Sequence, residues 1–241
     1  MPNNIMQLRF DNNSIVDKTG DTLFDTPTTV EFVDSPLEGK GYKALKTKSA
    51  TCLVNKGSFA INYQKGFTFC CWFNRLNGYN WPNKGTILAL YSDLYFEPIT
   101  YPYWNTALGD QQGLIFYFSN WINGDAYNGT YTSGEWAWIA ISFCPNRIST
   151  YLNGKRKSFK LDQIKFSTEE KDYGQNLCLF NYPNRDPHNY YNGSIFDVCL
   201  FPGTVDPDIG ELKVPTDYVT QNDLHLVDNW EIHSKYKLLS Y

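Results

Sequence analysis

The sequence predicts an all-β fold, a two-sheet antiparallel β-sandwich, from its aromatic content, its period-two segments and its closely spaced turn signals. Aromatic residues make up 17% of the 241 residues, with 18 Tyr and 16 Phe, and these side chains favour half-buried pleated surfaces. The segments between turns alternate apolar and polar residues or are apolar on both faces, and few follow the 3.6-residue period of a helix. We therefore expect few helices.

The clearest strand begins after Gly66 and contains the residues FTFCCWF. Successive side chains of a strand point to opposite faces, so one face carries Phe67, Phe69, Cys71 and Phe73, and the other carries Thr68, Cys70 and Trp72. A strand that is apolar on both faces belongs in the middle of a sheet.

Further strands are predicted between turn signals. Asn153-Gly154 predicts a type I′ hairpin, because both central residues of that turn need a positive φ, and Pro145-Asn146 predicts another. Three segments rich in Tyr, Trp, Asn and Pro are interpreted as loops, which often carry function; they are residues 92–112, 120–130 and 181–192. The predicted strands are residues 86–91, 113–119, 136–143, 147–153, 156–160, 176–180 and 193–201.

The charge, the lack of a long apolar run and the cysteine spacing exclude several classes of protein. A net charge of −4 and a pI near 5.4 give no basic field for nucleic acid. No apolar run approaches the 18 residues of a membrane span, and the opening residues do not resemble a secretory signal, so we expect synthesis in the cytoplasm without a signal peptide. The six cysteines show no CxxC spacing, and we interpret them as buried free thiols.

The pattern changes after Pro202-Gly203. Residues 204–241 contain two prolines, weak alternation and no self-sufficient apolar core. We expect residues 1–203 to form the sandwich and residues 204–241 to form an irregular C-terminal extension that docks on the domain or anchors it to a partner.

The order of these segments resembles a known family. The succession FTFCCWF, TIL, GLIFYF, SGEWAWIAISF, ISTYLNGK, NLCLF and YNGSIFDVCLFPG is similar to laminin-G-like domains of the concanavalin A-like lectin and glucanase superfamily, over roughly residues 8–203. The resemblance implies a jelly-roll sandwich whose members bind glycans, proteins or lipids. Many members carry two consecutive acidic residues in the late strand; here those positions are Phe196 and Asp197, which argues against a family-type calcium site.

Catalytic chemistry has little support in the sequence. Glycoside hydrolysis needs two carboxyl groups about 5 to 10 Å apart, and no Glu-x-Asp-x-Glu series occurs. The three histidines lie in predicted loop or tail, and no Gly-x-Ser-x-Gly motif is present. We predict no catalytic residue, no cofactor and no resident metal. Calcium is the open alternative, because four acids crowd the N-terminal segment, although turn formation is the favoured interpretation; they are Asp11, Asp17, Asp21 and Asp25.

Aromatic residues in the loops are the strongest functional signal. A ring outside a strand costs solubility unless it packs or binds something, sugars stack on rings, and neighbouring Asn and Asp side chains can bind hydroxyl groups. The alternative is that individual rings fold back over the ends of the sandwich. The candidate glycan-binding residues are Tyr79, Trp81, Tyr101, Tyr103, Trp104, Asp110, Trp121, Asp125, Tyr127, Asn128, Tyr190 and Tyr191.

Three functions compete. The favoured hypothesis is a non-catalytic glycan-binding or adhesion module displayed on a virion or other extracellular particle, for example as a bacteriophage tail, fibre or capsid-decorating subunit, with residues 204–241 contacting other subunits. The second is a purely structural assembly subunit with no glycan ligand. The third is an endoglucanase-like hydrolase, which would depend on Glu135 or Asp197.

Overall fold

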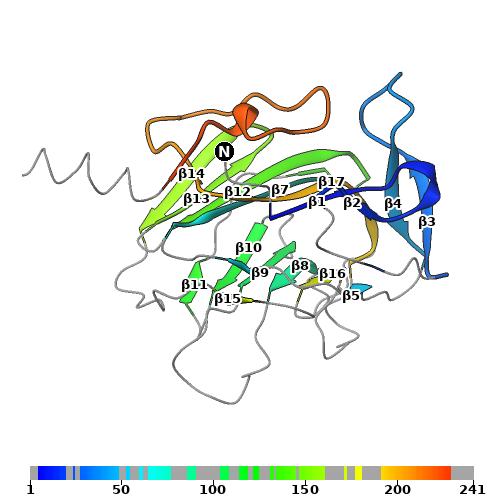
Figure 1. The fold of residues 1–241 in the computed structure, drawn as a ribbon, viewed down its shortest axis with the longest axis horizontal. Coiled ribbons are helices and arrows are strands. Elements are labelled where there is room, and N and C mark those ends of the chain that lie inside the picture. The colour runs from blue at the N-terminus through cyan, green and yellow to red at the C-terminus, as the bar shows by residue number, and fades with distance from the viewer. Residues whose placement is uncertain are drawn as a thin grey trace, which may run out of the picture.

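The chain folds into two stacked antiparallel β-sheets with almost no helix, as Figure 1 shows for a computed structural model. This confirms the predicted fold class. The only helices among the described residues are two short 3₁₀ turns, η1 (Asp11–Asn13) and η2 (Asn222–Leu224), and neither could cross a bilayer. The described residues are 5–19, 24, 28–48, 53–54, 60–61, 65–76, 86–90, 104–108, 114–118, 122–124, 131–132, 134–144, 147–160, 171–172, 177–180 and 191–228, several strands by their backbone alone.

The larger sheet has nine strands in the order β14-β13-β12-β7-β17-β1-β2, with β4 also paired to β17 and β3 paired to β4. Every pairing in it is antiparallel. Its strands are β1 (Met6–Arg9), β2 (Val16–Asp17), β3 (Val30–Asp34), β4 (Lys43–Thr47), β7 (Phe67–Arg75), β12 (Ala137–Cys144), β13 (Arg147–Leu152), β14 (Lys155–Lys160) and β17 (Gly193–Pro202).

The smaller sheet has six strands in the order β11-β10-β9-β8-β16-β5 and lies below the larger one in Figure 1. Two further pairs complete the described strands, namely β6 (Ala60–Ile61) with β15 (Lys171–Asp172), and β18 (Thr204–Val205) with β19 (Leu226–Val227). The strands of the six-stranded sheet are β5 (Leu53–Val54), β8 (Thr86–Leu90), β9 (Trp104–Leu108), β10 (Leu114–Phe118), β11 (Ile122–Gly124) and β16 (Leu177–Leu179).

The two faces of β7 behave as its sequence predicts. The strand lies between β12 and β17, in the middle of the nine-stranded sheet. Phe67, Phe69, Cys71 and Phe73 are fully buried in the core between the sheets, together with Leu53 and Leu179 from the smaller sheet. Cys70 is fully buried on the opposite, outer face, and Trp72 packs against the same outer cluster.

The Asn153-Gly154 hairpin also forms as predicted. Asn153 has φ 48° and Gly154 has φ 83°, and Leu152 pairs with Lys155 across the turn. A Cβ at Gly154 would lie 2.2 Å from the carbonyl oxygen of Leu212, and the Leu212 amide donates to the Gly154 carbonyl at 3.0 Å. Glycine is therefore required here both by the turn and by the extension that rests on it.

The structure corrects the loop assignments in two places. The segment 92–112, interpreted as a loop, contains β9, and the segment 120–130 contains β11. Both strands are short, with sequences WNTAL and ING, and neither alternates strictly between apolar and polar residues over the four to eight positions that mark a half-buried strand. Pairing with β10 forms them, and that partner is not visible in local sequence.

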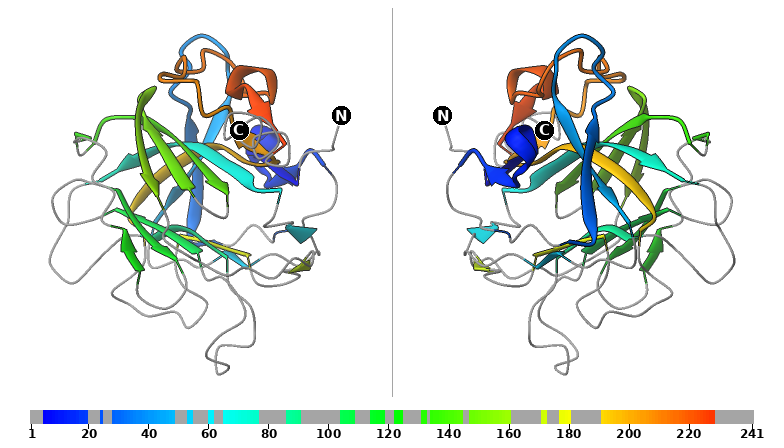
Figure 2. Two further views of the ribbon diagram at one scale, coloured as in Figure 1. Left: turned by 90° about the vertical axis from the view of Figure 1, so that its left-hand side faces the viewer. Right: turned by 90° about the vertical axis from the view of Figure 1, so that its right-hand side faces the viewer.

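The described part of the C-terminal extension, residues 204–228, covers the outer face of the nine-stranded sheet. Figures 1 and 2 show it in orange and red on the side away from the six-stranded sheet. β18 and β19 pair at its two ends and close it into a loop. Its Val205, Leu212, Val219 and Leu224 form a second buried cluster with outer-face residues of the sheet, namely Cys70, Trp138, Ala140, Tyr151, Cys199 and Phe201.

Hydrogen bonds also hold residues 204–228 on the outer face of the nine-stranded sheet. The Arg156 guanidinium donates to the carbonyl oxygens of Pro207 at 2.7 Å and Ile209 at 2.9 Å, and the Tyr151 hydroxyl donates to the latter at 3.1 Å. The buried Gln7 amide donates to the Val219 carbonyl at 3.2 Å. Carbonyl groups of an irregular segment need such partners when they are buried, so residues 204–228 are integrated with the sandwich.

Removing residues 204–241 should therefore expose Trp138, Tyr151 and Phe201, which are at most 1% exposed in the intact chain. Each large ring buries about 150–250 Å², so the new apolar patch would reach a size that promotes association. We expect the chain 1–203 to aggregate or to unfold at a clearly lower temperature, measured by size-exclusion chromatography and thermal denaturation. The control is the chain 1–228, which keeps every contact described above; a monomeric chain 1–203 of unchanged stability would contradict the prediction.

Candidate functional site

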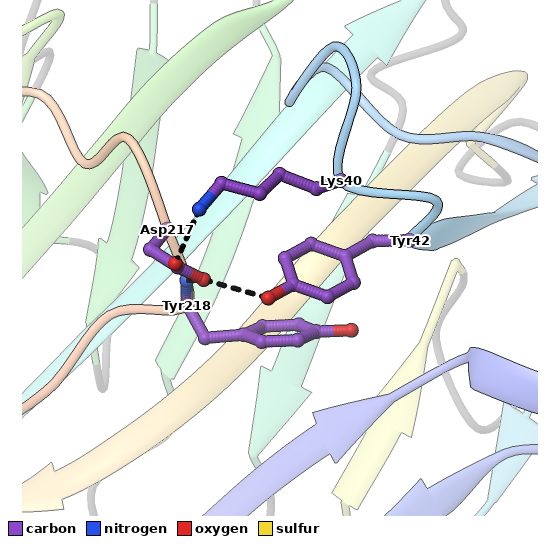
Figure 3. Close-up of polar contacts among 4 residues, drawn as sticks. All are labelled: Lys40, Tyr42, Asp217 and Tyr218. Atoms are coloured by element: carbon purple, nitrogen blue, oxygen red, sulfur yellow. Dashed lines mark hydrogen bonds and ion pairs between the residues drawn. The ribbon is translucent and has the colours of Figure 1, made fainter.

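A cluster of two tyrosines and four charged residues attaches the extension to the sheet at one point. We call it the tyrosine cluster; it consists of Arg9, Asp11, Lys40, Tyr42, Asp217 and Tyr218. Figure 3 shows four of these residues: Lys40 and Tyr42 come from the β3–β4 hairpin, and Asp217 and Tyr218 come from the extension. The cluster thus joins residues about 175 or more positions apart in the chain.

Asp217 is the polar centre of the cluster. Its carboxylate accepts from the Lys40 ammonium at 2.7 Å, from the Tyr42 hydroxyl at 2.9 Å and from the Tyr218 backbone amide at 2.8 Å. The Lys40 ammonium, followed by the Tyr218 amide and the Tyr42 hydroxyl, lowers the pKa of Asp217 to about 2. The carboxylate is charged at any ordinary pH, although its exposure to solvent makes the ion pair a weak one.

Tyr218 is the aromatic centre. The Arg9 guanidinium carbon lies 3.5 Å from its ring centroid, and the Tyr42 ring centroid lies at 4.1 Å. Its hydroxyl donates to both carboxylate oxygens of Asp11, at 2.8 and 2.7 Å, and burial together with that bond raises the pKa of Tyr218. The ring also packs on Phe196 of β17 at 5.3 Å. These groups bind one another, so the tyrosine cluster is best explained as an attachment point.

Asp197 is a buried carboxylate beneath the extension. It has φ 49°, a left-handed conformation that Asp tolerates better than most residues, and the register of β17 against β7 shifts between Phe196 and Cys199. This bulge turns the carboxylate toward the extension, where it accepts from the Val219 amide at 2.6 Å and from the Cys199 thiol at 3.4 Å. Burial raises the pKa of Asp197 to about 6, against the opposing effect of the Val219 amide.

The acids proposed for calcium do not form a metal site among the described residues. Asp11 accepts the Tyr218 hydroxyl, and Asp17 accepts the Gln7 amide together with the amide and hydroxyl of Thr19. Only the two bonds from Thr19 to Asp17 are local, as in a turn; the bond from Tyr218 to Asp11 joins the extension to the N-terminal segment. No group of three metal-ligating side chains is found in the described part of the chain, and Asp21 and Asp25 lie outside it.

Most of the predicted glycan-binding residues fall where the structure gives no description of the side chain. Trp104 begins β9 and is described by its backbone alone. The residues outside the described part are Tyr79, Trp81, Tyr101, Tyr103, Asp110, Trp121, Asp125, Tyr127, Asn128 and Tyr190.

The prediction for Tyr191 is wrong. Its ring is fully buried and stacks on Phe180 with centroids 5.8 Å apart. Its hydroxyl donates to the Ser194 carbonyl at 3.0 Å. Tyr191 lies two residues before β17, its backbone amide donates to the Phe180 carbonyl at 2.7 Å, and its ring belongs to the core between the sheets, so it cannot stack on a ligand.

The register of the six-stranded sheet defines its two ends. Trp104 pairs with Leu90 of β8 and with Phe118 of β10, and Phe118 also pairs with Ile122 of β11, so these four residues lie at one end. At the opposite end Thr86 pairs with Ala107 and Leu114 pairs with Leu108.

Similar folds occur among solved structures. Domain 4 of AbnA, an extracellular arabinanase from Geobacillus stearothermophilus, was solved in complex with arabinotriose; it matches with a TM-score of 0.59 and 16% identity over 85% of this chain and 94% of that domain. The binding domain of botulinum neurotoxin serotype G matches with a TM-score of 0.57 and 15% identity over 99% of this chain and 51% of the other.

A third structure is of botulinum neurotoxin type C, whose cell entry is described as dependent on interaction with two ganglioside molecules. It matches with a TM-score of 0.51 and 14% identity over 99% of this chain and 52% of the other. This chain thus spans about half the length of the toxin structures. No protein-family model and no curated protein sequence matches.

At these identities the likeness shows the fold alone, an antiparallel β-sandwich. None of the three structures is a laminin G domain or a bacteriophage protein, so these comparisons do not support the laminin G resemblance or display on a bacteriophage. The sequence motifs shared with laminin-G-like domains are features of the strands and hairpins, which many sandwiches have in common.

Two substitutions of Tyr218 in the tyrosine cluster should lower the stability of the chain to different degrees. Tyr218→Phe removes only the bond to Asp11 and should lower the free energy of unfolding by about 1–2 kcal/mol. Tyr218→Ala also removes the ring that packs on Tyr42, Phe196 and Arg9 and should cost about 2–4 kcal/mol. Urea unfolding measures both, and limited proteolysis within residues 204–228 should accelerate in the Ala variant alone. Equal effects of the two substitutions would show that the ring contributes nothing.

The raised pKa of Asp197 predicts that the stability of the folded chain depends on pH. A carboxyl group whose pKa rises from its ordinary 3.8 to about 6 on folding lowers the stability of the folded chain by about 3 kcal/mol at pH 7.5. Below pH 3.8 the carboxyl group is protonated in both the folded and the unfolded chain, and the folded chain keeps its full stability. That stability is lost as the pH rises through 6, where Asp197 becomes charged in its buried position. Asp197→Asn keeps an acceptor for the Val219 amide and tolerates the left-handed backbone.

The Asn variant should therefore unfold at a higher urea concentration than the wild type at pH 7.5, by up to about 3 kcal/mol, and the two chains should converge near pH 4. Asp208→Asn is the matched control, because Asp208 is exposed. An Asn variant that is less stable at pH 7.5 would mean that the charge itself holds Val219.

Proposed function

We propose that the chain is a non-catalytic glycan-binding module whose site lies at the end of the six-stranded sheet where β9 begins. The observation that supports the proposal is the register of β8, β9, β10 and β11, which brings Leu90, Trp104, Phe118 and Ile122 to one end of the sheet. In the sequence, Tyr101, Tyr103 and Trp121 adjoin these strand ends, and aromatic residues gathered at one end of a sheet can supply stacking surfaces for sugar rings. The arabinotriose complex of an arabinanase domain with a similar fold supports the same chemistry.

A binding role is favoured over hydrolysis by the positions of the two acids on which an endoglucanase mechanism would depend. Asp197 is 1% exposed and uses one oxygen for the Val219 amide and the other for the Cys199 thiol, so it does not meet a substrate. Glu135 is exposed and precedes β12 in a turn. A glycosidase needs two carboxyl groups that flank one bond, and this pair does not supply them.

Display on a virion or another extracellular particle is the second part of the proposal. Residues 204–228 pack on their own domain, so attachment to other subunits through the extension would use residues 229–241.

Glycan binding is tested with an array that contains arabino-oligosaccharides and ganglioside oligosaccharides, followed by titration calorimetry on the best ligand. Trp104→Ala and Trp121→Ala should each weaken binding by about tenfold, because loss of one stacked ring removes on the order of 1.4 kcal/mol. Trp81→Ala is the matched control: it removes the same side chain from the segment that precedes β8 in the sequence, outside the proposed site, and should leave the affinity unchanged.

Two results would count against the proposal. A blank array with a folded wild-type chain would leave the structural subunit as the remaining function. Binding that is lost in Trp81→Ala and kept in Trp104→Ala would move the site away from the end of the sheet where β9 begins.

A further inference from the structure

Two cysteines face each other across neighbouring strands on the outer face of the nine-stranded sheet. Cys70 of β7 and Cys199 of β17 are direct register partners in an antiparallel pair. Both are free and fully buried, and each thiol lies close enough to influence the pKa of the other. The neighbouring Cys71 points into the core between the sheets, so it belongs to a different environment.

This geometry is close to that of a disulfide. Directly opposed residues in an antiparallel pair have Cβ atoms about 4.5–5.5 Å apart, and a disulfide needs about 3.5–4.5 Å. The two strands would have to approach by up to about 1 Å. A bond formed in this way is strained and is therefore reduced more readily than a structural disulfide.

Asp197 supplies a proton acceptor for the pair. Its Oδ1 lies 3.4 Å from the Cys199 sulfur, which donates to it, and its Oδ2 holds the Val219 amide of the extension. The same carboxylate therefore contacts both a thiol and the segment that covers that thiol. Arg9 is the nearby cation and Asp217 the nearby anion that act on Asp197.

The extension keeps the pair unreactive while it is in place. Leu212, Val219 and Leu224 bury both cysteines in the outer cluster. Burial raises the pKa of both thiols, so that few thiolates form, and the thiolate is the form that attacks a disulfide. Reaction therefore requires local opening of residues 204–228, which the tyrosine cluster restrains.

We propose that Cys70 and Cys199 are a redox-active pair that forms a cross-strand disulfide when the extension opens and a small-molecule disulfide, such as oxidised glutathione, reaches them. Asp197 accepts the Cys199 proton, and the thiolate attacks the small disulfide; a mixed disulfide forms and one small thiolate leaves. The Cys70 thiolate then attacks the Cys199 sulfur and expels the second small thiolate. Two protein thiols are oxidised, one small disulfide is reduced to two small thiols, and these take up both protons.

The test uses the full chain in a Cys71→Ser background, so that the linked cysteine is unambiguous. The reduced protein is incubated with oxidised glutathione at pH 8, and peptide mapping by mass spectrometry without reductant follows the Cys70–Cys199 link. The link should form slowly in this background and roughly tenfold faster when Tyr218→Ala is added, because reaction of a covered group follows the population of the open form. Mild urea replaces Tyr218→Ala if that variant does not fold.

Two variants separate the parts of the proposal. Cys70→Ser should stop at a mixed disulfide between Cys199 and glutathione. Asp197→Asn in the Tyr218→Ala background, compared at urea concentrations that give the two chains equal stability, should slow formation of the link, which a purely structural role of Asp197 would not predict. The proposal is overturned if the opened chain keeps Cys70 and Cys199 reduced, carries only glutathione on them, or links either one to a different cysteine. The pair lies on the face away from the six-stranded sheet, so these results do not depend on glycan binding.

Discussion

The architecture depends on one constraint, which is that β7 and β17 are apolar on both faces. Their inner side chains are buried by packing against a second sheet; among them are Phe69, Phe73 and Leu200. Their outer side chains must be covered on the other side; among them are Cys199 and Phe201. The six-stranded sheet meets the first need and residues 204–228 meet the second. Since burial of apolar area is the main favourable contribution to folding, the extension is part of the folded unit.

The bulge at Asp197 connects this cover to the sheet. An extra residue in β17 leaves Asp197 in a left-handed conformation and allows its carboxylate to bind the Val219 amide. A buried carboxylate is costly, so the position is explained by what it contacts: the extension on one oxygen and the Cys199 thiol on the other. The ionisation of Asp197 is therefore linked both to the attachment of the extension and to the burial of the cysteine pair.

The two layers of the sandwich carry different roles in the proposed function. The outer face of the nine-stranded sheet is occupied by the chain itself, and its aromatic residues Tyr42 and Tyr218 bind each other and their charged neighbours. The proposed ligand site lies instead at the end of the six-stranded sheet where β9 begins with Trp104. A module of this kind can present a ligand site at one end of one sheet while the opposite layer remains stable and closed.

Local sequence determined the elements whose cause is local. The two-faced pattern of residues 67–73 predicted a central strand, and Asn153-Gly154 predicted a turn that needs two positive φ values; both are present. Only the tertiary structure decided the strand character of residues 104–108, the burial of Tyr191 and the placement of residues 204–228. Each of these features depends on partners far away in the chain, as the bond between Tyr218 and Asp11 shows. The residues that adjoin a position in the sequence do not tell which distant surface will cover it.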